Sequence, residues 1–242
     1  LFTSLCYSNQ VPYSISVGFF VDEKGQLKPV KDCAFCFFPT KEMTNLKFII
    51  HAPFLLTDSR EGIKANDVHN RTMISGLSKL AAKSILLLKQ IGNEMKMRLI
   101  DDKILTIIPI NEKLFEETND RNKISFKPFY TEILNLFSKE EIIPTIDGYT
   151  SKQNAYISDS ISLIQLFSNE QLAFLSGNPK AKWSFISIQF TEKSSYMFKD
   201  LVFSYVKLIT NDCLNDQSFL IPSSENNYKS WMPKSQKSFA IT

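Results

Sequence analysis

The sequence is poor in glycine and cysteine, and it lacks a strong charge surplus and any long apolar run. Its 242 residues include 7 glycines, no two of them within six residues of each other, which excludes the glycine-rich nucleotide loops of Rossmann and P-loop proteins. The 28 basic and 25 acidic residues give a net charge of +3, too small to predict a nucleic-acid or membrane partner. No stretch approaches the roughly 18 apolar residues of a membrane-spanning helix.

The four cysteines do not predict a metal site. Cys33 and Cys36 form a C-x-x-C pair within a strand-like segment, where residues three apart face opposite sides. A tetrahedral site would need a second such pair or paired histidines, and the chain has only His51 and His69. A nucleophilic pair of Cys36 with His51 is conceivable on neighbouring strands, but no third group is found that would orient the histidine. We therefore expect buried thiols and no bound metal.

The composition is that of an ordinary soluble globular protein, with 43% hydrophobic and 22% charged residues. The chain opens at Leu1 rather than Met, which indicates a piece of a longer protein. No charged segment followed by an apolar stretch marks a signal peptide, so the cytoplasm is the expected compartment.

The hydrophobic pattern predicts an α+β domain over residues 1–110. Helical periodicity over 67–91 predicts one long helix with an apolar stripe. Alternating runs predict four strands, at 13–21, 33–38, 46–51 and 103–108. We expect the first three to form an antiparallel meander with a turn at 22–25. The fold class is thus a mixed or antiparallel sheet packed against a long helix, an α/β sandwich.

A polar, charged segment at 111–123 predicts a domain boundary, with a smaller, mostly helical α+β region of unknown role at 120–242. Apolar spacing there predicts four helices, at 128–138, 160–167, 169–175 and 196–210. Alternation predicts one strand, at 183–189. The tail interleaves Tyr228, Trp231 and Phe239 with lysines, a pattern that can bind single-stranded nucleic acid but is more often an ordinary amphipathic surface.

Residues 48–64 carry the strongest functional signal. A strand passes Pro53 and leads into Thr-Asp-Ser-Arg-Glu at 57–61, which we expect immediately before or inside the start of a helix. Arg60 would there add to the positive end of the helix dipole and create an anion site suited to phosphate. The alternative is a capping box, in which Asp58 caps the helix and Glu61 reaches back to the Asp58 amide. The two interpretations are compatible with each other.

The segment Ala52-Pro53-Phe54 and the Thr-Asp-Ser-Arg-Glu that follows resemble the middle domain of the ninety-kilodalton heat-shock chaperones, and more closely that of sacsin-type proteins. Residues 142–148 also resemble sacsin-type segments. These proteins belong to the gyrase, chaperone, histidine-kinase and MutL superfamily. The resemblance implies a middle, or transducer, domain whose ATP and Mg²⁺ are held by a separate N-terminal domain. Alone, this chain would bind neither and would not hydrolyse ATP.

The resemblance also implies which residues form the site. Arg60 corresponds to the arginine that contacts the γ-phosphate, and Lys64 stands where the chaperones have glutamine and could supply further charge. Asp58, Ser59 and Glu61 would support the loop. The implied partners are the N-terminal ATPase domain, a client protein and a second copy in a homodimer. Independently of the resemblance, the small net charge and the lack of a long apolar run predict no membrane partner and argue against nucleic acid. The alternative function is a non-catalytic protein-interaction or nucleic-acid-binding module.

Overall fold

The computed structural model of this chain describes residues 1–30, 33–109, 111–115, 123–156 and 167–184. The chain divides into two compact units, one covering Leu1–Leu136 and the other starting at Phe137. The described residues are mixed α and β, with a mixed sheet and a long helix in the first unit, which confirms the predicted class at that level.

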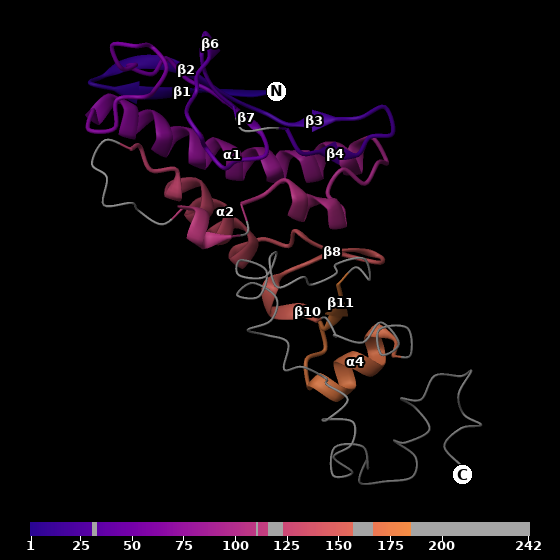
Figure 1. Cartoon of the computed structure of the whole chain (residues 1–242). Coiled ribbons are helices and arrows are strands. Elements are labelled where there is room, and N and C mark those ends of the chain that lie inside the picture. Colours follow the sequence, from indigo (N-terminus) through magenta and orange to yellow (C-terminus); the bar gives the residue numbers. More distant parts are fainter. Residues whose placement is uncertain (31–32, 110, 116–122, 157–166, 185–242) are drawn as a thin grey trace, which may run out of the picture. The chain divides into compact units, whose positions relative to one another are not determined.

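A five-stranded sheet with the order β1-β2-β7-β5-β6 is the centre of the first unit (Figure 1). Its strands are β1 (Phe2–Ser8), β2 (Val11–Gly18), β5 (Cys33–Cys36), β6 (Phe38–Pro39) and β7 (Ile49–His51). β1 and β2 are antiparallel and joined at Asn9 and Gln10, whose φ angles of 48° and 66° suit a tight hairpin turn. β2 pairs antiparallel with β7.

The predicted antiparallel meander is wrong. β5 and β7 run parallel, with Cys33 opposite Ile49 and Phe35 opposite His51. The chain between them first folds back as β6 and then crosses to the other side of β5, so that β7 lies between β2 and β5. Short strands with similar apolar patterns do not reveal such a crossing. β1 was not predicted, because only Cys6 and Ser8 of its residues are buried and the alternation is weak.

The predicted turn at 22–25 is confirmed. It joins β3 (Phe20–Val21) to β4 (Leu27–Lys28), and Gly25 donates its N–H to the Asp22 carbonyl at 2.9 Å with a φ of 74°. The predicted strand at 103–108 is wrong, since Asp102–Thr106 is a 3-10 helix. The buried isoleucines of the predicted strand, Ile104, Ile107 and Ile108, recur at helical rather than alternating spacing, and the last two follow the 3-10 helix.

The predicted long helix is confirmed as α1 (Val68–Glu94), which lies along one face of the sheet (Figure 1). Its buried stripe includes Met73 and Leu77, and it packs against β1 and β2. Gly76 lies at the closest approach, where an added Cβ would come within 2.7 Å of the Cys6 sulfur. Only glycine lets the helix and β1 approach this closely without a rearrangement.

The predicted helix at 128–138 is confirmed as α2 (Lys127–Lys139). The second unit contains two small strand pairs, the antiparallel hairpin of β8 (Ile143–Thr145) and β9 (Gly148–Thr150), and the parallel pair of β10 (Ala155–Tyr156) and β11 (Lys182–Trp183). Short 3-10 helices cover Glu112–Phe115 and Lys152–Asn154.

The predicted helix at 169–175 is confirmed as α4 (Asn169–Ser176), with a capping box of Ser168 and Gln171 and with Gly177 at a φ of 66°. Of the predicted strand at 183–189, Trp183 lies in β11 and the residues beyond Ser184 lie outside the described residues. The predicted helix at 160–167, apart from Phe167, the predicted helix at 196–210 and the aromatic tail also lie outside them. Within the part of the chain that the structure describes, no helix has the length and hydropathy needed to cross a bilayer.

Candidate functional site

The Ser-Arg-Glu sequence lies on a closed loop, residues 57–62, which we call the arginine loop. Leu56 and Ile63 form an antiparallel bridge at its base. Inside it, the Thr57 N–H donates to the Gly62 carbonyl at 2.8 Å, and the Arg60 N–H donates to the Thr57 carbonyl at 2.8 Å. The loop is therefore a small hairpin in its own right, inserted between β7 and α1.

Both sequence-based interpretations that place a helix start at this segment are wrong. α1 begins only at Val68, and its N-cap is Asp67, whose side chain accepts a hydrogen bond from the His69 N–H at 2.8 Å. Asp58 therefore caps no helix, and the Glu61 carboxylate contacts the Lys41 ammonium at 2.5 Å instead of the Asp58 amide. The N–H groups of Thr57 and Arg60 donate to carbonyls within the hairpin, so this segment forms a hairpin turn and not the first turn of α1.

The base of the arginine loop is fixed by Asn70, a fully buried residue near the start of α1. Its Oδ1 accepts from the Leu55 N–H at 2.8 Å, and its Nδ2 donates to the carbonyls of Leu55 and Lys64 at 2.7 and 2.9 Å. A side-chain amide offers two donor hydrogens and one acceptor oxygen, and all are used here. Asn70 thus joins both chains of the hairpin to the helix.

Residues 41 and 42 provide a second anchor. The Lys41 N–H donates to the Glu61 carbonyl at 2.8 Å, and Oε2 of Glu42 accepts from the Ile63 N–H at 3.0 Å. The returning half of the loop is therefore held by a segment that precedes it by about twenty residues in the sequence. With Asn70, these contacts give the loop a defined backbone.

Arg60 lies exposed at the tip of the arginine loop with a φ of 57°, a left-handed conformation uncommon for residues other than glycine. Within the described residues, no group accepts a hydrogen bond or ion pair from its guanidinium. Lys64 lies 3.7 Å from Asp58, and the Ser59 hydroxyl lies 3.1 Å from that of Thr57. The structure thus places Asp58, Ser59, Arg60 and Glu61 on the arginine loop and Lys64 just beyond its base, and within the described residues it leaves Arg60 unpaired.

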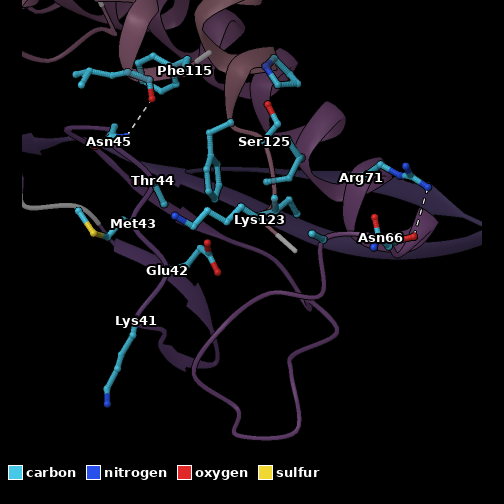
Figure 2. Close-up of a pocket in the computed structure, with 16 residues that line it drawn as sticks. Lys41, Glu42, Met43, Thr44, Asn45, Asn66, Arg71, Phe115, Lys123 and Ser125 are labelled. Atoms are coloured by element: carbon cyan, nitrogen blue, oxygen red, sulfur yellow. Dashed lines mark hydrogen bonds between the residues drawn. The ribbon is translucent and has the colours of Figure 1, made fainter. Parts of the chain in front are cut away.

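A hollow of about 760 Å³ lies beside the anchoring segment (Figure 2). Three charged residues, Glu42, Arg71 and Lys123, line the hollow. Lys41 also borders it, but its side chain points away from the hollow (Figure 2). Its walls also include six apolar side chains, those of Met43, Ile74, Leu114, Phe115, Ile124 and Phe126. Its size and mixed lining are within the range of small-molecule sites.

The thiol and imidazole candidates do not form a nucleophilic pair. In the parallel register, Phe35 rather than Cys36 lies opposite His51, so the Cys36 thiol is on the other face of the sheet and donates to the Phe54 carbonyl at 3.2 Å. Burial raises the pKa of Cys36, which disfavours the thiolate. His69 contacts the Pro53 carbonyl at 3.0 Å. The described residues hold no cluster of three potential metal ligands.

Sequence reasoning missed Asn70 and Glu42, the two side chains that anchor the arginine loop. A signal for Asn70 existed, because it lies three, four and seven residues before Met73, Ile74 and Leu77 and so falls on the buried stripe of α1. An amide on such a stripe indicates a specific buried partner. Glu42 carried no local signal, since its partner Ile63 is distant in the sequence.

Searches of protein-family models, curated proteins and solved structures find no match to this chain.

Proposed function

We propose that this chain is the transducer domain of an ATPase, with the α/β sandwich of the chaperone middle domains, and that Arg60 contacts the γ-phosphate of ATP. The observation that supports this is the exposed guanidinium of Arg60, which has no partner among the residues that the structure describes and lies at the tip of a loop anchored by Asn70 and Glu42. A planar guanidinium is the side chain best suited to bidentate contacts with phosphate oxygens.

In this proposal, ATP and Mg²⁺ bind to an N-terminal ATPase domain of the same polypeptide. Water attacks the γ-phosphorus, the bond to the oxygen that bridges the β- and γ-phosphates breaks, and ADP and inorganic phosphate leave. Arg60 stabilises the negative charge on the γ-phosphate oxygens, and its anchored loop keeps the cost of reorganisation small. Lys64 adds charge near the same site once its exposed contact with Asp58 opens.

The supporting residues act through the loop. Ser59 contacts the Thr57 hydroxyl and Glu61 contacts Lys41, so both stabilise the turn that presents Arg60. Because Arg60 and the nucleotide belong to different domains, hydrolysis requires the domains to dock. Docking then reports the nucleotide state to a client protein, and a homodimer would couple two such units.

The test is ATP turnover by the full-length polypeptide with its ATPase domain. Replacing Arg60 by alanine removes one preorganised cation and is expected to lower kcat by about 10²–10³, with nucleotide affinity nearly intact. Arg60→Lys should retain part of the activity, because charge remains while bidentate geometry is lost. Lys83→Ala, which removes an exposed cation of α1, is the control and should leave turnover unchanged. Unchanged turnover in Arg60→Ala would contradict the proposal.

A second candidate is a non-catalytic protein-interaction module. It is favoured by exposed aromatic side chains next to the short β5–β6 connection, where Phe37 and Phe38 are 74% and 79% exposed. Phe37 also has a φ of 61°, a strained conformation for a bulky residue. Absence of ATP turnover in the full-length wild-type polypeptide would favour this module over the transducer.

A further inference from the structure

The strand β1 presents an edge that lacks the features by which proteins protect sheet edges. It is the terminal strand in the order of the sheet, and among the described residues no strand pairs with its outer side. Its sequence, Phe-Thr-Ser-Leu-Cys-Tyr-Ser, contains no charge and no proline. Natural edge strands usually carry a lysine, a proline or a bulge that prevents pairing with another chain. β1 is therefore suited to accept a further strand.

A hollow of about 400 Å³ lies next to this edge, between β1 and one side of α1. The helical residues that line it recur every three or four positions and form one stripe, consisting of Val68, Arg71, Thr72, Ser75, Gly76 and Lys79. Cys6 lines it from β1. A strand added about 4.8 Å beyond β1 would place every second side chain over this hollow.

The floor and the rim of the hollow differ in character. The floor lies where Gly76 lets the helix approach Cys6. Val68, which is 65% exposed, lines the hollow two helical turns away, at the start of α1. The rim is cationic, with exposed Arg71 and Lys79 and no carboxylate among the lining residues. Burial raises the pKa of the Cys6 thiol, and the charge of Lys79 partly offsets this rise. The Arg71 guanidinium donates to the Asn66 carbonyl at 3.4 Å.

We propose that β1 and α1 form a groove that binds an extended acidic peptide as a sixth strand of the sheet. Arg71 and Lys79 are eight residues apart, about 12 Å along the helix. Residues four apart in a strand are about 13 Å apart, so acidic residues at positions i and i+4 match the two cations. The residue at i+2 lies over the floor and should be small and apolar. This inference goes beyond the proposed function and does not rest on it.

A second copy of this chain fits the groove less well. Its own β1 carries no acidic residue that could face Arg71 and Lys79. An uncharged strand would leave the cationic rim without a partner, whereas an acidic peptide supplies both backbone pairing and charge complementarity.

The binding test uses three fluorescein-labelled heptapeptides that differ only in charge. The acidic probe is Thr-Glu-Thr-Val-Thr-Glu-Thr, and glutamine or lysine replaces both glutamates in the other two. Fluorescence anisotropy at low salt should show about tenfold tighter binding of the acidic probe than of the glutamine probe. Strand addition further predicts that N-methylation of alternate residues abolishes binding in one pattern and spares it in the other, because only every second residue bonds to β1.

The protein variants separate the groove from general charge. The double variant Arg71→Glu with Lys79→Glu reverses the charge of both rim cations. It should bind the acidic probe at least tenfold more weakly than the wild type does, and it should bind the lysine probe more tightly. The control variant, Lys24→Glu with Lys83→Glu, changes the net charge by the same amount at exposed sites outside the groove. Its affinity for the acidic probe should stay within about twofold of the wild-type affinity. Circular dichroism verifies that each variant is folded.

Three results of the binding test would overturn the proposal. These are equal binding of the acidic and glutamine probes, no effect of the rim reversal, or equal tolerance of both methylation patterns. Self-association in analytical ultracentrifugation that the acidic probe does not compete away would assign the edge to a second copy and would equally overturn it. None of these measurements involves ATP, so their failure is distinct from failure of the transducer function.

Discussion

The hydrogen bonds of Asn70 predict that a single buried amide determines the order of the arginine loop. In Asn70→Ala, the Leu55 N–H and the Lys64 carbonyl each lose their only partner among the described residues. The Leu55 carbonyl keeps its bond from the Lys64 N–H at 3.0 Å. A buried group without a partner costs about 1–3 kcal/mol, and Leu55 is 46% exposed, so water can replace part of the loss. We expect destabilisation of about 2–3 kcal/mol.

The assay combines urea unfolding with hydrogen exchange measured by mass spectrometry. A domain of ordinary stability survives this loss, so the amides of Leu55 and Lys64 should exchange faster while α2 keeps its protection. The matched control is Ser84→Ala, another buried polar residue of α1, whose hydroxyl donates to the Leu80 carbonyl at 2.7 Å. That carbonyl keeps its helical partner, so the cost should stay below about 1 kcal/mol. Equal costs in both variants, with unchanged exchange at residues 55–64, would refute the role assigned to Asn70.

Three further predictions concern backbone strain, packing and pH. In urea unfolding, Arg60→Gly should be more stable than Arg60→Ala by up to about 1 kcal/mol, because only glycine adopts a φ of 57° without strain. Equal stabilities of the two variants would show that the backbone at position 60 is not strained. Gly76→Ala should cost about 1–2 kcal/mol, since its Cβ would lie 2.7 Å from the Cys6 sulfur. The cost should fall in the Cys6→Ala background without disappearing, because Ile15 Cδ1 at 3.1 Å and the Cβ of residue 6 at 3.3 Å remain close; a purely additive double mutant would contradict the contact with the sulfur. The hydrogen bond from the backbone N–H of Gln26 lowers the pKa of Asp22, and the Lys28 ammonium lowers it further. The ionised form therefore stabilises the folded state above the unfolded-state pKa of about 3.9, and this contribution is lost as the pH falls through the lower folded-state pKa. The stability difference between wild type and Asp22→Asn, measured by urea titration, should accordingly be present at neutral pH and vanish in strong acid; a constant difference would refute the assignment.

The elements that the sequence predicted correctly are those whose signals are local. Helix α1 combines 3.6-residue periodicity with a capping aspartate, and the turn before β4 contains Gly25 at the position that needs positive φ. The 3-10 helix at Asp102–Thr106 was misread because five residues give too few repeats to separate alternation from helical spacing.

Pairing between distant segments was not predictable in the same way. The parallel pairing of β5 with β7 depends on how the intervening chain crosses the sheet, and the residues of the two strands do not indicate this connection. The site shows the same division. The sequence grouped Arg60 with its neighbours but placed them at a helix start, which is wrong, because the bridge of Leu56 with Ile63 closes this segment into a hairpin. Its anchors, Asn70 and Glu42, act across the fold and became visible only in three dimensions.

The closed base of the arginine loop makes residues 58–61 a replaceable insert. The hydrogen bonds across its base join backbone groups, and the side chains that hold it, Asn70 and Glu42, lie outside the insert. Sequence changes between Thr57 and Gly62 remove the side-chain contacts of Ser59 and Glu61, but we expect them to leave the sheet and α1 intact, because the backbone hydrogen bonds at the base and the contacts of Asn70 and Glu42 remain. The fold can accept grafted tip sequences of the same length at this point, and the scaffold offers a fixed, solvent-facing position for peptides chosen by design.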